Sequence, residues 1–439
     1  MEKIKNLGRK VTPRSAINAY HLGQSFFYSR KHGKPADQMI VIGIVGSKGK
    51  TTTANLLWAA LSETREKVGQ IGTANIRFGE KEQLNKYHMT MPGAKIMQRI
   101  LAQMKLAGCK YVIMEVPSEG QTQYRHIGIN FDILIFTNVT KEYLAAHKFN
   151  LEILHKHNKR VFNYMAKSKR KIIGGRLIPK TIIANIESPF ADDYLNFDVD
   201  KKITFGSSSS ANYRLKNIKL DSQKVIFEIN NYPYHINIAG EINATNATGA
   251  IACARELGVN EPLIQKGFDQ LLSIPGRMEI IDEGQKFSVF VDYAHEQVGM
   301  HALMASAQKM SAKDSKIITL LGAEGGGRDE KKRPIMGKIV SKNSDYIIIS
   351  NVDPYKDDPM KIIEDIAKGA EKAGKKRGKD LFLIEDRRAG IAKALSLADK
   401  NDLVFITGKG AEQSIVINGK SSPWDDRQVV REELKKLGC

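Results

Sequence analysis

Short apolar runs alternate with amphipathic stretches along most of the chain after residue 38. The apolar runs are rich in β-branched residues, and the stretches between them, such as residues 359–373, place apolar positions at helical spacing. This alternation is typical of buried parallel strands joined by crossover helices. The pattern therefore predicts α/β architecture in both halves, with buried strands at residues 39–45, 111–116, 133–137, 316–321, 346–350, 381–385 and 403–407.

Two changes in this pattern predict the domain organisation. Strict apolar–polar alternation appears at residues 225–229 and 234–238, a helix is predicted over 244–257, and the breaker pair Pro275-Gly276 precedes a strand at 287–291. We therefore predict a basic leader at 1–38 with one helix over 15–30, a central α/β domain with a parallel sheet at 39–275, and a C-terminal Rossmann-like α/β domain at 276–439.

Charge and composition narrow the class of protein. The 68 Lys and Arg outnumber the 48 Asp and Glu, but they are spread along the chain, and the two densest runs, 167–176 and 372–379, carry no aromatic ladder for stacking bases. We therefore expect a solvated basic surface rather than a nucleic-acid stripe. The charge alone leaves nucleic acid, an anionic surface and a polyanionic small substrate open as partners. No apolar run approaches the roughly 18 residues of a membrane span, and no apolar stretch follows the charged start. We expect a cytoplasmic protein without membrane insertion.

Cysteine usage excludes two further classes. The three cysteines, Cys109, Cys253 and Cys439, are far apart and form no C-x-x-C or Cys/His pattern. This spacing predicts neither a disulfide framework nor a structural zinc site.

The strongest local motif follows the first predicted strand and opens a helix. Glycines there let backbone amides close around phosphates at a helix N-terminus, while a lysine reaches the outer phosphates and a threonine hydroxyl holds Mg²⁺. A strict Walker motif would place glycine at position 44, where Ile44 stands. The remaining G-x-x-G-K-T pattern still predicts an ATP site made of Gly46, Ser47, Lys48, Gly49, Lys50, Thr51 and Thr52.

Two later strand ends carry candidate metal ligands. Glu115 ends one predicted strand, and segment 142–147 follows another. Because ligands gather at the carboxyl ends of parallel strands, both should face the phosphate loop. A carboxylate there can bind the Mg²⁺ that bridges phosphates. Glu115 is predicted to be such a ligand, with an ordinary surface acid as the alternative, while His155 and His157 are expected to be solvated.

A series of ordered motifs from about residue 40 to the end resembles the Mur ligases, most closely the branch that adds the third residue of the peptidoglycan stem peptide. The motifs that carry the resemblance are Gly46-Ser-Lys-Gly-Lys-Thr51, Glu115-Val-Pro-Ser-Glu-Gly120, Phe136-Thr-Asn138, Asn243-Ala-Thr-Asn246, Pro275-Gly-Arg-Met-Glu279, Val291-Asp-Tyr-Ala-His295, Arg328-Asp-Glu-Lys-Lys-Arg-Pro-Ile-Met-Gly337, Asp353-Pro-Tyr-Lys-Asp-Asp-Pro359, Gly408-Lys-Gly-Ala-Glu412 and Asp425-Asp-Arg427.

The resemblance implies an ATP- and Mg²⁺-dependent ligase that forms an amide bond through an acyl phosphate. It implies catalytic roles for Lys50, Glu115, His295 and Lys159, the last as a carbamylated lysine that binds metal together with Thr51 and Glu115; an ordinary surface lysine remains the alternative for Lys159. By the same resemblance, Asn246, Arg277 and Asp292 would bind ATP, and Thr90 and Arg125 would hold the acceptor.

The chain departs from the family pattern where substrates and metal would bind. Glu142-Tyr143 stands where the family has a metal-binding histidine after an acid, and Glu119 and Ala411 each replace a family histidine. Tyr355 stands where the family has the arginine that recognises the distal carboxylate of meso-diaminopimelate, and Asp353 takes the place of the preceding asparagine. Arg328 and Glu412 remain to bind the incoming amino acid. We therefore expect lysine or another single-carboxylate amino acid to be preferred.

The remaining expectations concern the acceptor and the alternatives. Only 38 residues precede the first strand, so we expect the usual N-terminal uridine-binding domain to be absent and the acceptor to be held through its pyrophosphate, sugar or peptide. The alternatives are a folylpolyglutamate or cyanophycin-type ligase and a basic P-loop ATPase that binds nucleic acid. The run Arg333-Pro-Ile-Met-Gly337 favours the cell-wall branch.

Overall fold

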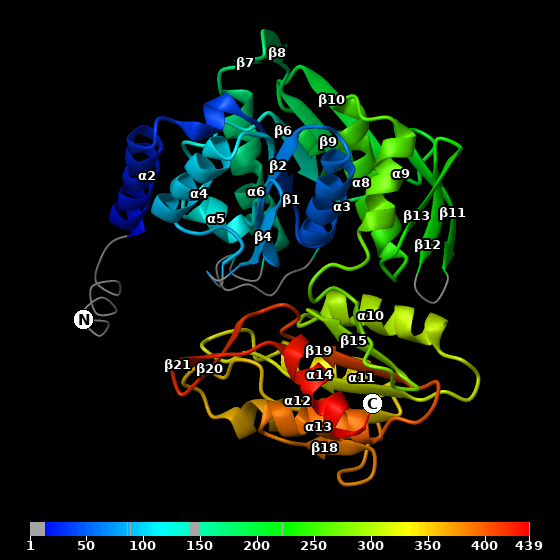
Figure 1. Ribbon diagram of the computed structural model, residues 1–439. Coiled ribbons are helices and arrows are strands. Elements are labelled where there is room, and N and C mark those ends of the chain that lie inside the picture. The colour runs from blue at the N-terminus through cyan, green and yellow to red at the C-terminus, as the bar shows by residue number, and fades with distance from the viewer. Residues whose placement is uncertain are drawn as a thin grey trace.

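The computed structural model describes residues 14–85, 87, 89–140, 147, 150–220 and 224–438. It contains two α/β domains, one with an eleven-stranded sheet and one with a six-stranded sheet, which lie one above the other in Figure 1. The core clusters on either side of residue 275 share no residues. The chain therefore folds around two separate cores, with the phosphate loop in the first.

The large sheet has a parallel centre and antiparallel ends. Strands β11, β10, β9, β6, β1, β5 and β2 run parallel in this order, while β3–β4 and β12–β13 add antiparallel strands at the two edges. Their bounds are β1 Ile40–Val45, β2 Lys67–Ile71, β3 Asn75–Phe78, β4 Lys81–Leu84, β5 Cys109–Glu115, β6 Ile133–Phe136, β9 Thr181–Asn185, β10 Lys201–Gly206, β11 Tyr213–Leu220, β12 Val225–Ile229 and β13 Tyr232–Ile236.

Helices cover both faces of this sheet, because its central strands are apolar on both sides. One face packs against α3 (Lys50–Ser62), α8 (Ile242–Glu256) and α9 (Glu261–Gln270). The other packs against α4 (Ala94–Leu106), α6 (Leu151–Ala166) and α7 (Ala191–Leu195), with the short α5 (Ser118–Thr122) after β5. A separate hairpin, β7 (Lys171–Ile173) and β8 (Arg176–Ile178), projects from the top of the domain (Figure 1).

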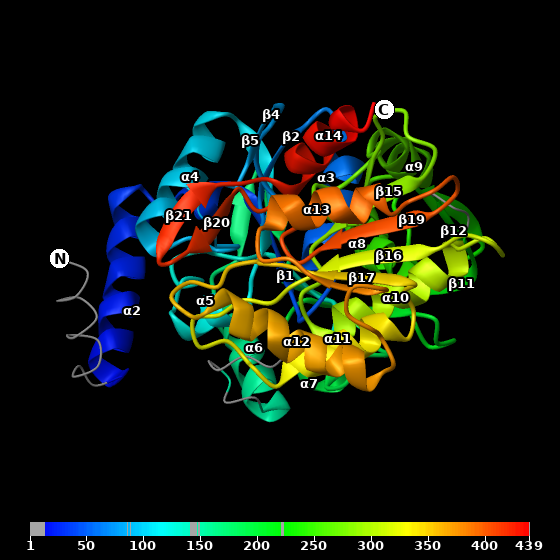
Figure 2. The ribbon, with the colours of Figure 1, turned by 90° about the horizontal axis from the view of Figure 1, so that it is seen from below.

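The C-terminal sheet is also mostly parallel and covered by helices on both faces. Its order is β14-β15-β19-β16-β17-β18, with only β14 antiparallel. Figure 2 shows α10, α11 and α12 on one side of this sheet and α13 and α14 on the other. The bounds are β14 Glu279–Ile281, β15 Ser288–Asp292, α10 Gln297–Met310, β16 Ile317–Leu321, α11 Lys332–Ser341, β17 Tyr346–Ile349, α12 Pro359–Lys372, β18 Leu381–Leu383, α13 Arg387–Ser396, β19 Leu403–Thr407, β20 Ser414–Ile417, β21 Lys420–Pro423 and α14 Asp426–Lys436.

The helix predicted in the leader is present as α2 (Arg14–Lys31), followed by the 3₁₀ turn η1 (Pro35–Gln38). Its buried positions are polar: the Ser25 hydroxyl donates to the Tyr124 carbonyl at 2.9 Å, and the Ser29 hydroxyl donates to the Gly128 carbonyl at 2.9 Å. The helix therefore docks on the central domain through hydrogen bonds rather than through a large apolar face. None of the described helices combines the length and apolar content needed to cross a membrane.

The sequence prediction of α/β architecture is confirmed. All seven predicted strands are present, and their bounds differ from the predicted ones by only a few residues. The strand predicted at 381–385, β18, is less buried than expected, since Leu381 is its one buried residue. The prediction missed β2–β4 and the β7–β8 hairpin, because their runs are short and interrupted by charged or polar residues. It also missed the antiparallel pair β20–β21, because all four residues of β21 are exposed and show no apolar pattern.

Candidate active site

The loop between β1 and α3 forms a tight turn that requires its glycines. Gly46 and Gly49 adopt positive φ angles of 146° and 82°. A Cβ on Gly46 would lie 2.1 Å from Thr137 Oγ1, and one on Gly49 would lie 2.1 Å from Asn246 Oδ1. The loop is therefore held between the end of β6 and helix α8, with its backbone amides at the N-terminus of α3.

Asn138, which follows β6, fixes the loop from the other side. The Ser47 amide donates to its carbonyl oxygen at 2.8 Å, and the Lys48 amide donates to its Oδ1 at 2.9 Å. The Thr137 hydroxyl donates to the Lys48 carbonyl at 2.8 Å. These contacts give the turn a fixed shape without using the side chain of Lys50.

Lys50 lies over this loop. Its ammonium donates to the carbonyl oxygens of Gly46 at 2.5 Å and Ser47 at 2.9 Å. Thr51 and Thr52, the next two residues, are buried at the start of α3. The arrangement places one positive charge and the helix N-terminus at the same point, which is the electrostatic basis of phosphate binding.

Glu115 faces the loop from the end of the neighbouring strand, as predicted from the parallel sheet. Its side chain is buried, and the Thr51 hydroxyl donates to its Oε2 at 3.0 Å. Thr73, in the loop after β2, donates its backbone amide to Oε1 at 2.7 Å and its hydroxyl to Oε2 at 3.0 Å. Three donors, one from the start of α3 and two from the loop after β2, therefore orient a single carboxylate beside the phosphate loop.

Thr90 and Arg125, the residues expected to hold the acceptor, lie next to the Glu115 network. The Thr90 and Thr73 hydroxyl oxygens are 2.8 Å apart, so Thr90 is one hydrogen bond from the Glu115 network. Arg125 donates to the Met91 carbonyl and, at 2.5 Å, to Gln123 Oε1. Burial lowers the pKa of the Arg125 guanidinium, and nearby Glu119 partly opposes that shift.

The C-terminal domain reaches the phosphate loop through Arg277. Its guanidinium donates to Thr51 Oγ1 at 3.3 Å and lies 4.5 Å from the centre of the Tyr293 ring. Asp292 accepts the backbone amides of Met278 at 2.8 Å and Ala294 at 2.7 Å, which fixes the segment that carries Arg277. Burial raises the pKa of Asp292, although the Arg277 charge opposes this shift.

His295 lies at the start of a buried charge network. Lys332 donates to its carbonyl oxygen at 3.0 Å, to Glu296 at 2.7 Å and to Glu324 at 2.9 Å. Burial lowers the pKa of the His295 imidazole. Burial alone would raise the pKa of Glu324, but the charges of His295 and Lys332 outweigh it and hold that pKa at about 2.

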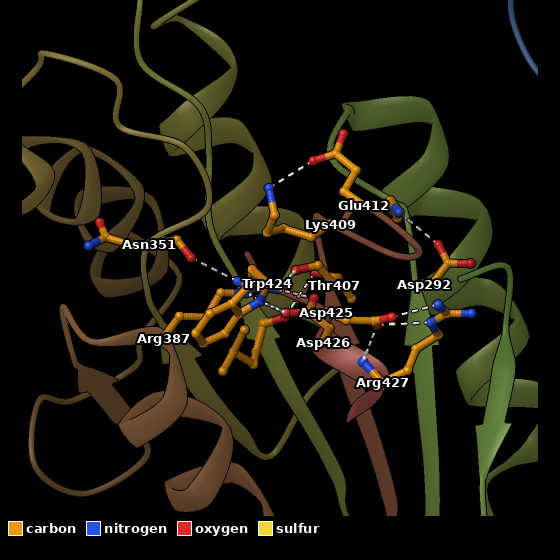
Figure 3. Close-up of polar contacts among 12 residues, drawn as sticks. Asp292, Asn351, Arg387, Thr407, Lys409, Glu412, Trp424, Asp425, Asp426 and Arg427 are labelled. Carbon is orange, nitrogen blue, oxygen red and sulfur yellow. Dashed lines mark hydrogen bonds and ion pairs between the residues drawn. The ribbon is translucent and has the colours of Figure 1, made fainter. Parts of the chain in front are cut away.

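A second network surrounds the residues expected to bind the incoming amino acid. The buried Lys409 ammonium donates to Asp353 at 2.8 Å and to Glu412 at 2.7 Å, and the Tyr293 hydroxyl donates to Glu412 at 3.0 Å. The Val416 amide donates to the other Asp353 oxygen at 2.7 Å. Both oxygens of Asp353 and both oxygens of Glu412 are therefore bonded within the protein, and Figure 3 shows the contact between Lys409 and Glu412.

Arg328 and Tyr355 lie together beside these acids. Burial lowers the pKa of Arg328, but Glu324, Glu119 and a hydrogen bond with the Tyr355 hydroxyl raise it by more. Tyr355 adopts a positive φ angle of 56°, and its ring packs against Gly326. Glu119 lies on α5 of the central domain, so its charge acts on a residue of the C-terminal domain.

Two ion pairs fix the strand ends beneath this network (Figure 3). Arg387 binds Asp426 through two bonds, of 2.8 and 2.6 Å, and donates to the carbonyls of Asn351 and Thr407. Arg427 binds Asp425 through bonds of 2.9 and 2.6 Å. The Arg387 and Asp426 side chains are fully buried, so this pair joins the ends of β17 and β19 to the start of α14.

A cavity of about 250 Å³ opens beside the phosphate loop. Its wall combines backbone and side chains from the ends of β6, β9 and β10 with the start of α8. Asn246 contributes to this wall and donates to Asn243 Oδ1 at 2.9 Å. The residues that line the cavity are Thr137, Asn138, Val139, Thr140, Asn185, Glu187, Ser188, Pro189, Phe205, Ile242, Thr245 and Asn246.

The structure does not bring Lys159 to the Glu115 network. Its ammonium lies 3.8 Å from the Asp193 carboxylate and 5.7 Å from the centre of the Phe197 ring. His155, predicted to be solvated, is instead buried between Phe190 and Tyr194 and bonded to Asp193 at 2.7 Å. That prediction was wrong, because the polar run around His155 is one face of an amphipathic helix. Glu142 and Tyr143 lie outside the described residues.

The oxygen donors present suit Mg²⁺. Among the described residues no group of three or more His, Cys, Asp or Glu side chains is placed to hold a metal ion. Mg²⁺ is commonly bound by one or two carboxylates together with substrate phosphates and water. Glu115 and the Thr51 hydroxyl, 3.0 Å apart at the phosphate loop, match that donor set.

Several residues of the site escaped sequence reasoning. Thr73 lies in a loop after a strand that was not predicted. Lys332 and Lys409 are lysines whose ammonium groups are almost completely buried, contrary to the usual preference of the residue. The motif Gly408-Lys-Gly410 was the one available signal for Lys409.

Comparison with known proteins identifies two matching domains. Residues 44–254 match the Mur ligase middle domain, and residues 276–410 match the Mur ligase, glutamate ligase domain. A UDP-N-acetylmuramoyl-L-alanyl-D-glutamate--2,6-diaminopimelate ligase of Aquifex aeolicus is 34% identical over 93% of this chain and 80% of that protein. A UDP-N-acetylmuramyl-tripeptide synthetase of Treponema denticola is 31% identical over 93% of this chain and 78% of that protein.

Solved structures share the fold. A UDP-N-acetylmuramoyl-L-alanyl-D-glutamate--2,6-diaminopimelate ligase superposes with a TM-score of 0.60 at 23% identity, covering 92% of this chain and 79% of that chain. A folylpolyglutamate synthase of Mycobacterium tuberculosis complexed with ADP superposes with a TM-score of 0.70 at 14% identity, covering 99% of this chain and 97% of that chain. At these identities the likeness concerns the fold.

Proposed function

This chain belongs to the Mur ligase family, and on that premise we propose that it joins an amino acid to a muramoyl-peptide precursor of the cell wall through an acyl phosphate. As a member of the family it is an ATP-dependent, ADP-forming ligase of carbon–nitrogen bonds. The names of its relatives support a UDP-muramoyl peptide as acceptor.

The observation that carries the proposal is the double contact of the Thr51 hydroxyl. It lies 3.0 Å from the Glu115 carboxylate of the central domain and 3.3 Å from the Arg277 guanidinium of the C-terminal domain. The phosphate loop, an oxygen ligand for a cation and a positive charge from the second domain thus meet at one point. Phosphoryl transfer needs this combination, because negative charge spreads over the transferred group in the transition state.

In the proposed reaction the acceptor carboxylate attacks the γ-phosphorus of ATP, and the bond to ADP breaks. The amine of the incoming amino acid then attacks the acyl carbon, and inorganic phosphate leaves with the electrons of the broken C–O bond. Lys50 and Arg277 would stabilise charge on the transferred phosphoryl group. Glu115 and Thr51 would hold Mg²⁺, which when bound neutralises phosphate charge. The rest of the rate acceleration would come from binding the two anionic substrates next to each other in the orientation for reaction.

Nucleotide and acceptor have separate candidate sites. The adenine is proposed to lie in the cavity beside the phosphate loop, which has Asn246 in its wall. The phosphates are proposed to bind to the loop residues Gly46 to Thr52. Asp292 would act by fixing the segment that carries Arg277. Thr90 and Arg125 are proposed to hold the acceptor, because Thr90 is linked through Thr73 to Glu115.

The incoming amino acid would bind at the second network. Arg328 is proposed to pair with its α-carboxylate and Glu412 with its amino group. Asp353 is better placed to position Lys409 than to touch the substrate, since its side chain is 10% exposed whereas that of Glu412 is 29% exposed. His295 would act from the domain boundary, where its neutral imidazole can accept a proton.

The identity of the amino acid rests on Tyr355. Several relatives carry 2,6-diaminopimelate in their names, which favours a diamino acid. One guanidinium, Arg328, lies beside Tyr355, and it can pair with one carboxylate only. A second buried carboxylate without a partner costs several kcal/mol. We therefore propose lysine rather than meso-diaminopimelate. Kinetics in which meso-diaminopimelate is used at least as well as lysine would contradict this choice but leave the ligase assignment intact.

The function is tested by ATP hydrolysis with defined partners. ADP release should rise when an amino acid and UDP-muramoyl dipeptide are both present, and should not respond to DNA or RNA. Stimulation by nucleic acid without the peptide precursor would favour the P-loop ATPase alternative. Stimulation by a folate and glutamate would favour the folylpolyglutamate alternative.

A further inference from the structure

The β7–β8 hairpin displays an apolar pair in a strongly basic segment. Ile172 and Leu177 face each other across the two strands, and their side chains are 72% and 62% exposed. The segment 167–180 contains six Lys and Arg and no acid. Single exposed aliphatic residues are common on protein surfaces, but a cross-strand pair within such a segment is not explained by chance exposure.

The base of the hairpin is anchored to the sheet by buried charges. Lys171 at its start donates to Asp132 at 2.6 Å and to the Met39 carbonyl at 2.8 Å, and Lys180 after its end donates to Asp132 at 3.1 Å. All three charged side chains are almost completely buried. Ile173 and Ile178 pack against the apolar core on the inner face. The outer pair is therefore held in solvent by a fixed base.

Four exposed basic residues lie near the apolar pair in the sequence. Lys167, Lys169, Arg170 and Arg176 are exposed, and of these Arg170 is paired with Asp200. The helix end before η1 adds exposed Lys31 and Lys34 at the same edge of the domain, because η1 packs against both β7 and α4. Leu106, the last residue of α4, is 85% exposed at this edge as well.

This edge is remote from the active site. The hairpin base contacts residues just before β1 and β6, whereas the phosphate loop and Glu115 follow the carboxyl ends of β1 and β5. A strand of six residues spans about 20 Å. Figure 1 shows the hairpin at the top of the central domain and the C-terminal domain below it. A partner on the hairpin would leave the phosphate loop and Glu115 accessible.

We propose that the β7–β8 hairpin and its basic surroundings, called here the hairpin surface, dock on an anionic lipid bilayer. Ile172 and Leu177 enter the boundary between headgroups and acyl chains, while Lys167, Lys169 and Arg176 contact lipid phosphates. The charge of the segment and the absence of acids within it match a negative membrane, and clustered Lys and Arg beside apolar side chains are the usual signature of such binding. This inference does not depend on the proposed substrates.

The test is co-sedimentation of the full chain with phosphatidylcholine vesicles that contain or lack phosphatidylglycerol. Binding should require phosphatidylglycerol and fall as salt is raised. Lys169→Glu/Arg176→Glu should weaken it by about thirtyfold or more, the factor that corresponds to two basic residues at about 1 kcal/mol each. Ile172→Ser/Leu177→Ser should weaken it by about tenfold or more. Both variants should keep normal ligase turnover.

The matched control is Lys372→Glu/Lys379→Glu in the second dense basic run, which makes the same change in net charge and has no exposed large apolar side chain among its described residues. Equal weakening by this control, equal binding to vesicles without phosphatidylglycerol, or no vesicle binding would overturn the proposal. If the chain binds RNA as tightly as it binds vesicles, and Ile172→Ser/Leu177→Ser does not weaken the binding to RNA, the hairpin surface is a general polyanion-binding surface instead. A dimer that dissociates in that variant would indicate self-association.

Discussion

Replacing Glu115 by glutamine tests the candidate metal ligand with little change in shape. The amide oxygen of Glu115→Gln can still accept the Thr73 backbone amide, now bonded at 2.7 Å. The amide nitrogen would face the Thr51 and Thr73 hydroxyls, which donate at 3.0 Å in the native chain. Hydroxyls can rotate and accept instead. We therefore expect the fold to survive.

The expected magnitudes differ between stability and activity. Exchanging charged for neutral hydrogen bonds at one carboxylate should cost about 1–2 kcal/mol of unfolding free energy. For activity, a unit charge about 4 Å from a cation is worth roughly 4 kcal/mol at an effective dielectric constant of about 20. Loss of this charge should raise the Mg²⁺ concentration for half-maximal ADP release by at least about a hundredfold.

The assay is coupled ADP release over a titration of Mg²⁺, with thermal unfolding of the same samples. Glu256→Gln is the control, because Glu256 is also partly buried and bonded to two side chains, Tyr213 and Lys201, but lies at the far end of α8. It should leave the Mg²⁺ requirement unchanged. A Glu115→Gln enzyme with native turnover and a native Mg²⁺ requirement would refute the assignment of Glu115.

Three further changes test other parts of the account. Lys50→Ala should abolish ligase and ATPase activity while far-ultraviolet circular dichroism stays native, since Asn138 shapes the loop without the Lys50 side chain; near-normal turnover would reject the phosphate-loop assignment. Carbamylation of Lys159 stays a prediction, and the contact of Lys159 with Asp193 disfavours it. An inactive Lys159→Ala enzyme whose activity is restored by a short carboxylic acid would support the modification. Unaltered activity of Lys159→Ala would reject it. The pKa of Glu324 is held at about 2, below its ordinary 4.5, so its ion pairs stabilise the fold above pH 4.5 and lose this contribution as the pH falls toward 2. In urea unfolding, the Glu324 contribution should lower the free energy of unfolding by up to about 3 kcal/mol between pH 4.5 and pH 2, and Glu324→Gln should lack this contribution. Equal pH dependence of both proteins would contradict the stated cause.

The central features of the site could be predicted from the sequence because they are local or follow from sheet geometry. The phosphate loop lies within seven consecutive residues, Gly46 to Thr52, and Glu115 follows from the rule that strand ends of a parallel sheet share one edge. Arg277 and Asp292 came from the family resemblance, and their distances could not be predicted, since they depend on how two domains meet.

Other features depend on long-range packing and gave no local signal. Thr73 acts through a backbone amide and a hydroxyl in an unremarkable loop. Lys409 and Lys171 are buried because acids distant in sequence, Asp353 and Asp132, compensate their charge. Lys159 was assigned from the family resemblance, which does not fix the direction of its side chain on α6. Its ammonium lies 3.8 Å from Asp193 and does not reach Glu115.

The central claim is that this chain forms an amide bond between a muramoyl peptide and an amino acid at the expense of ATP. The most direct measurement is mass analysis of the products after incubation with ATP, Mg²⁺, UDP-muramoyl dipeptide and a pool of amino acids. The account predicts a new species heavier than the acceptor by one amino acid residue, formed in equal amount with ADP and phosphate, and absent with Lys50→Ala. ADP formation without any such product, or a product that forms without ATP, would contradict it.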